Sequence, residues 1–559
     1  MKKKLRSNFE PGTPRWATRR AQWTALGLTD ADMEKPKIAV VNSSSELAIC
    51  FSHLDGIAKV VKEAITKAGG LPFEIRTVAP SDFIVSAGGV GYILSARDLI
   101  VNDMEIAVQG AQLDGMICLS SCDKTPPAHM MAAGRFNIPT IIVVCGYQPA
   151  GTYEGKHVDI EDVFLGSTHA LMGKVSLEQL KGMSENAIRG PGVCQGMATA
   201  NTMHTVCEAI GMALPGSAPV LANSPKMFDD ARHAGERIVQ MVLEDLKPHD
   251  ILTPGAFRNA VAAVLAVSGS INAVKHLQAT AVETGLDLDV FGLFEELSDK
   301  IPVLSAVRPN GADTIEDFEK AGGARAIMKQ LGELLDLDAM TVTGKTVRDN
   351  LADVKVANEE VIRPVSRAFS TKPPIVILHG SLAPESAIIK LGTGKNRKLA
   401  ITGPALVFEN GQDATDALKA GKIKAGDVIV VRGDGPKGQP GMGGSAGMVI
   451  FALDALGMSA DVGLVTDGQL SGLCNKGITV AEISPEAAVG GPLSLVENGD
   501  TIIIDVEKRR LDLDVPEELL RERRARLGEP VLPKYSGYLS IYQKNVQPMS
   551  RGAVLVNND

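Results

Sequence analysis

A thiol, a carboxylate and an amine stand side by side at Cys122, Asp123 and Lys124, in the stretch LSSCDKTPPAHM. The apolar segment 113–120 that precedes them is typical of a buried strand, and Pro126 suits the first turn of a helix. In open α/β sheets, ligands bind at the carboxyl ends of the strands, so this position favours a binding site. A capping aspartate beside a buried cysteine and a solvated lysine explains the same residues without a site, and this stretch alone leaves both interpretations open.

Two further cysteines have the same local setting. Cys50 lies in ELAICFSHLDG, between an apolar run and a helical pattern, and Cys194 lies in the glycine-rich stretch RGPGVCQGMATANTM before another helical pattern. A thiolate at a helix N-terminus is stabilised by the helix dipole and by free N–H groups, and iron–sulfur clusters are bound by cysteine thiolates. Cys50, Cys122 and Cys194 are therefore candidate cluster ligands, although their long-range spacing matches no ferredoxin pattern.

The remaining cysteines fit a packing role better. Cys118, Cys145 and Cys207 lie within apolar strand or helix patterns, where a free cysteine behaves as a small core residue. Cys474 lies in a loop close to Ser471 and fits either role. An odd total of seven cysteines, in a chain whose basic N-terminus lacks an apolar signal segment, argues for reduced thiols, so we expect a cytoplasmic protein.

Two glycine-rich stretches resemble nucleotide-binding loops but lack their defining residues. GPGVCQG at 190–196 has one residue too many between its glycines for a dinucleotide-binding fingerprint. GDGPKGQPGMGG at 433–444 has Gln439 where a phosphate-binding loop needs lysine. Both are better explained as tight turns that let the backbone approach a ligand, which argues against a nucleotide-binding oxidoreductase.

The elements around these residues alternate between strand and helix patterns. Short apolar runs at 37–42, 113–120 and 138–145 are typical of buried strands, and helical patterns occupy 54–68 and 95–111. This alternation predicts a doubly wound parallel sheet covered by helices on both faces.

The pattern changes in the Pro/Ser/Thr-rich segment 360–375, which is typical of a linker. Beyond it the apolar runs are shorter and the glycines denser, as expected for a barrel or a sandwich. Because 559 residues are too many for one core, we predict an N-terminal α/β domain over residues 1–365 and a C-terminal β-rich, barrel-like domain over residues 366–559.

Composition excludes two classes of partner. The net charge of −9 argues against nucleic acid and against an anionic membrane surface. No apolar run reaches the roughly 18–20 residues that span a bilayer. With 45% hydrophobic and 22% charged residues, the chain has a composition that is ordinary for a soluble globular enzyme.

Five motifs occur in one order along the chain: CDKTPP, GVCQGMATANTM, GPKGQPGM, TDGQLSG and ISPEAAVGGPLSLVENGD. Together they resemble the dihydroxy-acid/6-phosphogluconate dehydratase family over nearly the whole chain. The resemblance implies a hydro-lyase that removes water from a 2,3-dihydroxy carboxylic acid to give a 2-keto acid, with an iron–sulfur cluster and Mg²⁺ as cofactors. It also implies a homodimer or a dimer of dimers.

The resemblance gives roles to single residues. The three cysteines match the cluster ligands, which can hold a [2Fe–2S] or a [4Fe–4S] cluster, and we favour [2Fe–2S]. Asp82, in APSDFIV, and Asp123 match magnesium ligands. Lys124 matches a lysine that is carbamylated in the family and binds the same ion. Ser471, in TDGQLSG, matches the serine that acts as the base in the family. The catalytic base is therefore expected in the C-terminal domain.

The chain departs from the family pattern at several positions. Gly444 stands where the family has a glutamate that binds magnesium, Glu482 stands where it usually has histidine, and Ile271 replaces a usual threonine. A glycine offers no side-chain ligand, so Asp434 or Glu482 are the candidates to compensate.

Three functions follow from these motifs. The segments ATANTM and ALPGSA favour the dihydroxy-acid branch of the family, which belongs to branched-chain amino acid biosynthesis. The C-terminal segment SGYLSIYQKNV favours the alternative, a sugar-acid (aldonate) dehydratase. A cluster-bearing paralogue without activity is the third hypothesis, and Gly444 supports it.

Overall fold

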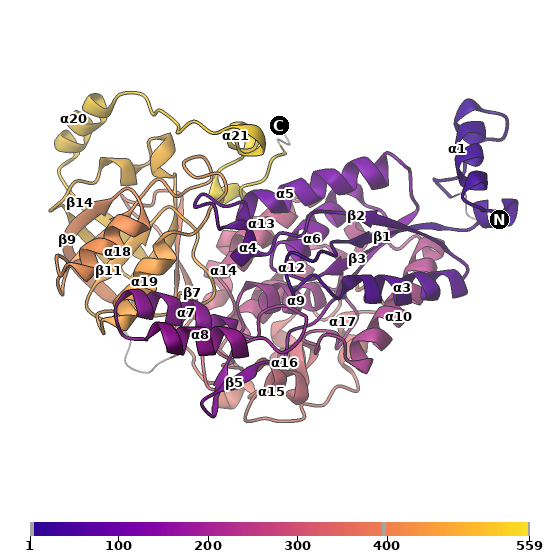
Figure 1. The fold of residues 1–559 in the computed structure, drawn as a ribbon, viewed down its shortest axis with the longest axis horizontal. Coiled ribbons are helices and arrows are strands. Elements are labelled where there is room, and N and C mark those ends of the chain that lie inside the picture. Colours follow the sequence, from indigo (N-terminus) through magenta and orange to yellow (C-terminus); the bar gives the residue numbers. More distant parts are fainter. Residues whose placement is uncertain (1–4, 394–397, 557–559) are drawn as a thin grey trace.

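The structure, a computed structural model, describes residues 5–393 and 398–556. Its N-terminal part is built on a four-stranded parallel sheet and its C-terminal part on an eight-stranded mixed sheet, and the two parts lie side by side (Figure 1). The chain is therefore an α/β protein with a parallel N-terminal sheet and a barrel-like C-terminal sheet, as the sequence patterns predict. The boundary between residues 365 and 366 lies in an irregular segment with one short 3₁₀ turn and stays a prediction.

The N-terminal sheet has the strand order β2-β1-β3-β4. Its strands are β1 (Lys37–Asn42), β2 (Leu71–Arg76), β3 (Gly115–Ser120) and β4 (Thr140–Val144). Burial is complete at every position of β1, β3 and β4, because helices cover both faces of the sheet. On one face α3 (Leu54–Lys67) packs with α10 (Pro225–Glu244), and on the other α5 (Ile93–Met104) packs with α6 (Thr125–Phe136). Burial on both faces explains why the strands are continuous apolar runs.

This strand order contains a switch point between β1 and β3. From β1 the chain crosses to β2 on one side, and from β3 it crosses to β4 on the other. The loops that leave the carboxyl ends of β1 and β3 diverge there and open a crevice, which is where open α/β sheets bind ligands. The loop 43–53 carries Cys50, and the loop 121–124 carries Cys122, Asp123 and Lys124.

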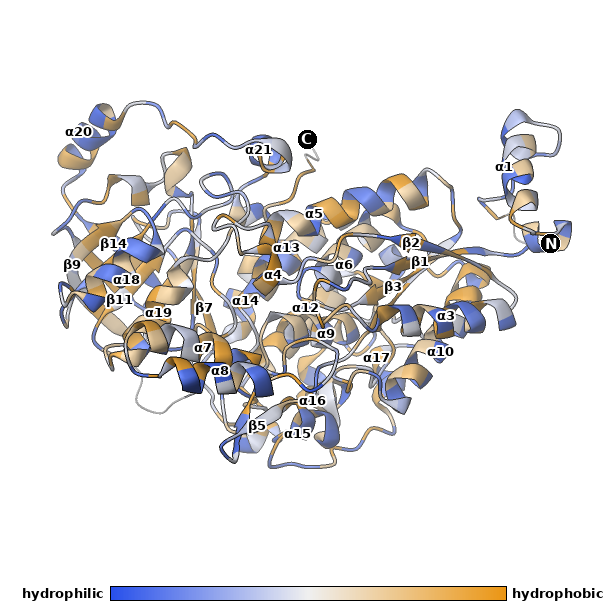
Figure 2. Ribbon diagram, in the orientation of Figure 1, coloured by the Kyte–Doolittle hydropathy of each residue, from blue (hydrophilic) through white to orange (hydrophobic). Residues whose placement is uncertain are grey.

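Helices form most of the remaining N-terminal part. They are α1 (Pro14–Ala25), α2 (Asp30–Met33), α4 (Asp82–Val85), α7 (Ile160–Leu171), α8 (Leu177–Asn186), α9 (Thr199–Ala209), α11 (Pro248–Ile251), α12 (Pro254–Ala266), α13 (Asn272–Thr284), α14 (Val290–Ser298), α15 (Ile315–Ala321), α16 (Gly323–Leu331) and α17 (Val347–Leu351), with a hairpin of β5 (Gly151–Tyr153) and β6 (Lys156–Val158). In Figure 2 the hydrophobic colour is concentrated on the inner strands and on the helices packed between them.

The C-terminal sheet has the order β14-β13-β9-β10-β11-β12-β8-β7. Its strands are β7 (Ile375–Leu378), β8 (Ser386–Lys390), β9 (Ala400–Phe408), β10 (Val428–Val431), β11 (Gly463–Thr466), β12 (Ile478–Ser484), β13 (Thr501–Asp505) and β14 (Arg510–Asp514). The two edge strands meet where His379 donates its N–H to the Arg509 carbonyl at 3.0 Å and accepts from the Leu511 N–H at 2.8 Å. The sheet is therefore nearly closed, which leaves few unpaired edges.

Four α-helices lie in the described residues of the C-terminal part: α18 (Gly411–Lys419), α19 (Ala446–Ala455), α20 (Glu517–Leu527) and α21 (Gly537–Asn545). Two sequence predictions differ from the structure in detail. The strand predicted at 113–120 begins at Gly115. The Leu113 N–H closes the preceding helical turn on the Val108 carbonyl, and the Asp114 carboxylate accepts backbone N–H bonds from Ser7 and Lys37. The helix predicted at 95–111 ends as a π-helical turn over Glu105–Gln109. Within the described residues, no helix has the length and apolar character to cross a membrane.

Candidate active site

A cavity of about 930 Å³ lies between the two parts and collects most of the predicted site residues. Its N-terminal wall comes from the loops after β1 and β3, the start of α4 and the loop before α9. Its C-terminal wall includes the loop that follows β11. The predicted residues that line it are Cys50, Asp82, Cys122, Asp123, Cys194 and Ser471. Lys124 lies directly behind this wall and is fully buried.

The three predicted cluster ligands come from three separate loops to one side of the cavity. A hydrogen bond between the Cys50 and Cys122 side chains lowers the pKa of Cys50 and raises the pKa of Cys122. Burial and the negative charge of Glu161 raise the pKa of Cys194. Thiols gathered beside carboxylates ionise readily only when a cation joins them, and three thiolates are a suitable donor set for an iron–sulfur cluster. The residues present therefore fit that group.

A compact charged group lies next to the thiols. The Lys124 ammonium donates to Asp123 Oδ2 at 2.9 Å and to Asp82 Oδ2 at 3.4 Å. Burial opposes ionisation of Asp123, but the Lys124 charge holds its pKa below the usual range, while burial and the Asp123 charge raise the pKa of Asp82. Asp82 Oδ1 is buried and has no hydrogen-bond partner among the described residues. Carboxylate oxygens are the preferred ligands of Mg²⁺, so this pair fits a magnesium ion.

The charge state of Lys124 differs from what carbamylation requires. That reaction needs a neutral amine, and burial does act to lower the Lys124 pKa, but the charges of Asp123 and Asp82 outweigh burial and raise it. The two carboxylates thus hold the amine protonated, and carbamylation of Lys124 stays a prediction.

Ser471 reaches the cavity because the next residue is a glycine. A Cβ at Gly472 would lie 2.9 Å from the Ala198 Cα, so only glycine lets this loop pack so closely against the N-terminal part. The Ser471 Oγ accepts the Leu473 N–H at 3.2 Å and lies 3.7 Å from the Cys474 sulfur. Cys474, which the sequence left open, thus contacts the predicted base.

Gly444 lines the cavity with φ of +73°, and a Cβ placed there would meet only the Gln469 carbonyl, at 3.7 Å. The position is open and offers no side-chain ligand. The two candidate substitutes have other partners: Asp434 accepts from Gln439 at 3.2 Å and from Ser445, and Glu482 pairs with Lys275 at 2.5 Å. Neither carboxylate lines the cavity, so the structure does not support either as a replacement ligand.

Sequence reasoning missed two charged residues at this site. Glu161, on the first turn of α7, lines the cavity; its Oε1 is buried and has no partner within the described chain. A Cβ at Gly196 would lie 2.2 Å from the Glu161 carboxylate, so a glycine makes room for it. Lys390 ends β8 and is 1% exposed. The sequence carries one local signal for Lys390, a charged residue at the end of the apolar run SAIIK. It carries no local signal for Glu161.

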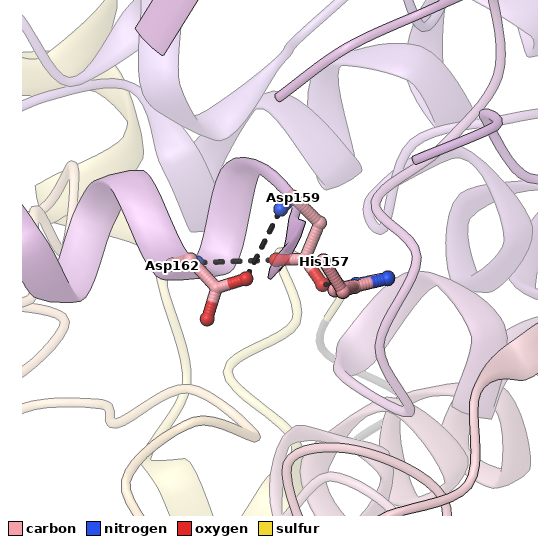
Figure 3. A group of neighbouring side chains, drawn as sticks. All are labelled: His157, Asp159 and Asp162. Atoms are coloured by element: carbon pink, nitrogen blue, oxygen red, sulfur yellow. Dashed lines mark hydrogen bonds and ion pairs between the residues drawn. The ribbon is translucent and has the colours of Figure 1, made fainter. Parts of the chain in front are cut away.

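A separate cluster near the cavity joins His157, Asp159 and Asp162 (Figure 3). Asp159 is the N-cap of α7 and accepts the N–H groups of Glu161 and Asp162, and Asp162 accepts the Asp159 N–H in return. His157 lies 3.0 Å from Asp159, and Arg308 donates to Asp162 at 2.7 Å. These carboxylates are used by the helix cap and by the arginine, which explains the cluster without a metal.

Comparison with known proteins agrees with this geometry. Residues 35–350 match the model of the dihydroxy-acid/6-phosphogluconate dehydratase N-terminal region, and residues 360–553 match that of the C-terminal region. A dihydroxy-acid dehydratase of Ignicoccus hospitalis is 41% identical over 545 residues, which are 97% of this chain and 98% of that protein. Dihydroxy-acid dehydratases of Methanococcoides burtonii and Sulfurisphaera tokodaii are each 42% identical, over 98% and 99% of this chain and 99% of each relative.

Proposed function

The chain belongs to the dihydroxy-acid/6-phosphogluconate dehydratase family, and from this premise we propose how its cavity works. The activity is that of a dihydroxy-acid dehydratase, a hydro-lyase that converts a 2,3-dihydroxy carboxylic acid into a 2-keto acid. The observation that carries this function is the full-length similarity to relatives of that name. The cavity that brings thiols, carboxylates and a serine together from both parts of the chain supports it.

We propose that Cys50, Cys122 and Cys194 hold a [2Fe–2S] cluster and that Asp82, Asp123 and a carbamylated Lys124 hold Mg²⁺. When bound, the cluster supplies a Lewis acid for the leaving hydroxyl, and Mg²⁺ stabilises negative charge on the substrate oxygens. The unpartnered Asp82 Oδ1 supports the magnesium site. The gathering of the three cysteines at one wall supports the cluster.

Ser471 is the proposed base. It takes the proton from C2 of the substrate, the C–H electron pair forms the C2=C3 double bond, and the C3–O bond breaks with its electron pair on oxygen. The departing hydroxide takes up one proton to become water, which balances the proton that Ser471 has taken from C2. The resulting enol tautomerises to the 2-keto acid. A serine ionises only when its oxyanion is stabilised, and the Leu473 N–H that points at Oγ contributes to that stabilisation.

The cavity wall favours a small branched acid. Apolar side chains such as Ile49, Ile160, Phe164, Phe451 and Leu473 line much of it, and they suit the methyl groups of a branched substrate better than the hydroxyl groups of an aldonate. This observation supports the dihydroxy-acid branch, and a sugar acid is the alternative outcome of the substrate test.

We also propose a homodimer or a dimer of dimers, located in the cytoplasm. Leu47, Ile49 and Ile84 line the cavity yet are 70%, 42% and 46% exposed, which suits a contact with a second copy. All seven cysteines are free, which suits a reducing compartment.

The first experiment is anaerobic purification followed by iron and sulfide counting and a visible spectrum. Keto-acid release is then measured with 2,3-dihydroxyisovalerate and with a panel of aldonates, each with and without Mg²⁺. Iron–sulfur absorbance with Mg²⁺-dependent turnover of 2,3-dihydroxyisovalerate is the expected result. Ser471→Ala is the matched control, which keeps the cluster spectrum and loses turnover. A cluster without turnover on any substrate supports the inactive paralogue, and absence of iron after reconstitution overturns the cluster assignment.

A further inference from the structure

A buried lysine lies behind the proposed base. Lys390 is the last residue of β8, and its ammonium donates to the Gly472 carbonyl at 2.9 Å. Within the described residues this is its only hydrogen bond, and it forms no ion pair. Burying a charge is costly unless it is paired, so packing alone does not account for a lysine here.

The contact joins the barrel to the catalytic loop. Gly472 follows Ser471, and the loop is pressed against Ala198 and Ser270 of the N-terminal part. Asn475, three residues beyond Gly472, donates to the Pro309 carbonyl at 3.1 Å. Lys390 therefore secures this loop from the sheet side, while contacts with the N-terminal part secure it from the other side.

Two titratable groups face Lys390 from the elements around it. Glu161 lies on α7 of the N-terminal part, and Cys474 lies on the Ser471 loop. Burial lowers the pKa of Lys390 to about 7, and the charges of Glu161 and Cys474 oppose that shift. Burial and the charge of Asp159 raise the pKa of Glu161 well above its usual range, and its Oε1 has no partner within the described residues.

We infer that Lys390 is a positioning residue for proton transfer at Ser471: its ammonium holds the Gly472 carbonyl and places a positive charge behind the serine that must ionise. A positive charge favours the ionised form of a neighbouring hydroxyl, and a charge in a water-excluded site acts more strongly than one in solvent. The inference rests on the proposed role of Ser471 and adds a residue that acts through it.

The variants separate the charge from the hydrogen bond. Lys390→Gln keeps a donor for the Gly472 carbonyl and removes the charge, Lys390→Arg keeps the charge, and Lys390→Met removes both. Lys37→Met is the matched control, because Lys37 is also a fully buried lysine but begins β1 at the end of the strand that faces away from the cavity.

The measurement is kcat and KM for 2,3-dihydroxyisovalerate against pH, on the cluster-loaded enzyme, with the visible spectrum as a check that each variant folds and holds its cluster. Lys390→Gln and Lys390→Met are expected to lower kcat roughly tenfold or more with little change in KM, and to move the rising limb of log kcat by about one pH unit to higher pH. Lys390→Arg is expected to keep the wild-type position of that limb and to extend activity at alkaline pH, since arginine stays charged.

Two results overturn the inference. If Lys390→Gln has the kcat and pH profile of the wild type, Lys390 only anchors the loop. If Lys390→Arg loses as much activity as Lys390→Gln while holding its cluster, the positive charge has no role. Failure of the proposed function looks different: either the wild type lacks turnover, or Ser471→Ala keeps it.

Discussion

The buried pair between Lys275 and Glu482 offers a quantitative test of how the two parts of the chain are held together. Lys275 lies on α13 and Glu482 on β12, both side chains are 0% exposed, and their charged atoms are 2.5 Å apart. Burial lowers the pKa of Lys275 to about 8, against the opposing charge of Glu482. The variant Glu482→Gln removes that charge, and the buried lysine is then expected to lose its proton in the folded state.

The magnitude follows from that pKa. One pH unit corresponds to about 1.4 kcal/mol. Loss of a proton that Lys275 holds with a pKa of about 8 therefore costs roughly 1 kcal/mol at pH 7, roughly 3 kcal/mol at pH 6 and nearly nothing at pH 8. The sign follows from linkage. The folded variant binds one proton fewer than the unfolded chain, whose lysine titrates near 10.4, so its stability rises with pH. The destabilisation relative to wild type should therefore shrink from pH 6 to pH 8.

The assay is the thermal unfolding midpoint of the cluster-loaded protein, followed by far-UV circular dichroism between pH 6 and 8. A chain of this size is not expected to unfold in two states, so the readout is the difference in midpoint between variant and wild type at each pH. We expect a deficit of several degrees at pH 6 that disappears near pH 8. The double variant Lys275→Met/Glu482→Gln has no ionisable group at this place, so its offset should not depend on pH. A deficit for Glu482→Gln that stays constant or grows with pH would refute the reasoning.

Three further predictions concern the cavity. Cys122→Ser should abolish the visible iron–sulfur absorbance while the far-UV spectrum is kept, and an unchanged absorbance would remove Cys122 from the ligand set. Gly472→Ala should lower kcat by roughly tenfold or more, because its Cβ would lie 2.9 Å from the Ala198 Cα and displace the Ser471 loop; kinetics identical to wild type would contradict this. Gly444→Glu should lower the Mg²⁺ concentration that gives half-maximal activity, because the position faces the cavity with room for a side chain. The same variant should have a lower unfolding midpoint, because a residue with a side chain is strained at a φ of +73°. An unchanged or higher Mg²⁺ requirement would show that residue 444 does not reach the ion.

Much of the N-terminal architecture is predictable from short-range patterns. The run KIAVVN becomes β1 over the predicted residues 37–42, because a strand buried on both faces needs a continuous apolar run. The prolines after Lys124 predict the start of α6 at Thr125, because proline suits the first turn of a helix. The position of Cys122 at the carboxyl end of a strand favours a site, because open α/β sheets bind ligands at that edge.

Other parts of the site carry no local signal. Glu161 looks like an ordinary first-turn acid of a helix, and only the fold turns it into the cavity beside Cys194. The charge environment of Lys124 is not visible in the sequence either: Asp82 and Asp123 contact its ammonium in the structure, and their charges raise its pKa against the effect of burial. The pKa of a side chain depends on neighbours that are distant in sequence, so it cannot be obtained from the residues next to it.

The sequence by itself determined the alternation of strands and helices, the cysteines at the ends of strands and before helices, and the family, because these depend on local periodicity and on short motifs. Only the tertiary structure decided that Ser471 lies at the same cavity as Cys50, that Lys390 supports its loop, and that Asp434 and Glu482 have partners other than a metal. These outcomes depend on how a nearly closed barrel packs against a parallel sheet. That packing is set by the summed burial of many side chains from both parts, and no single stretch of sequence encodes it.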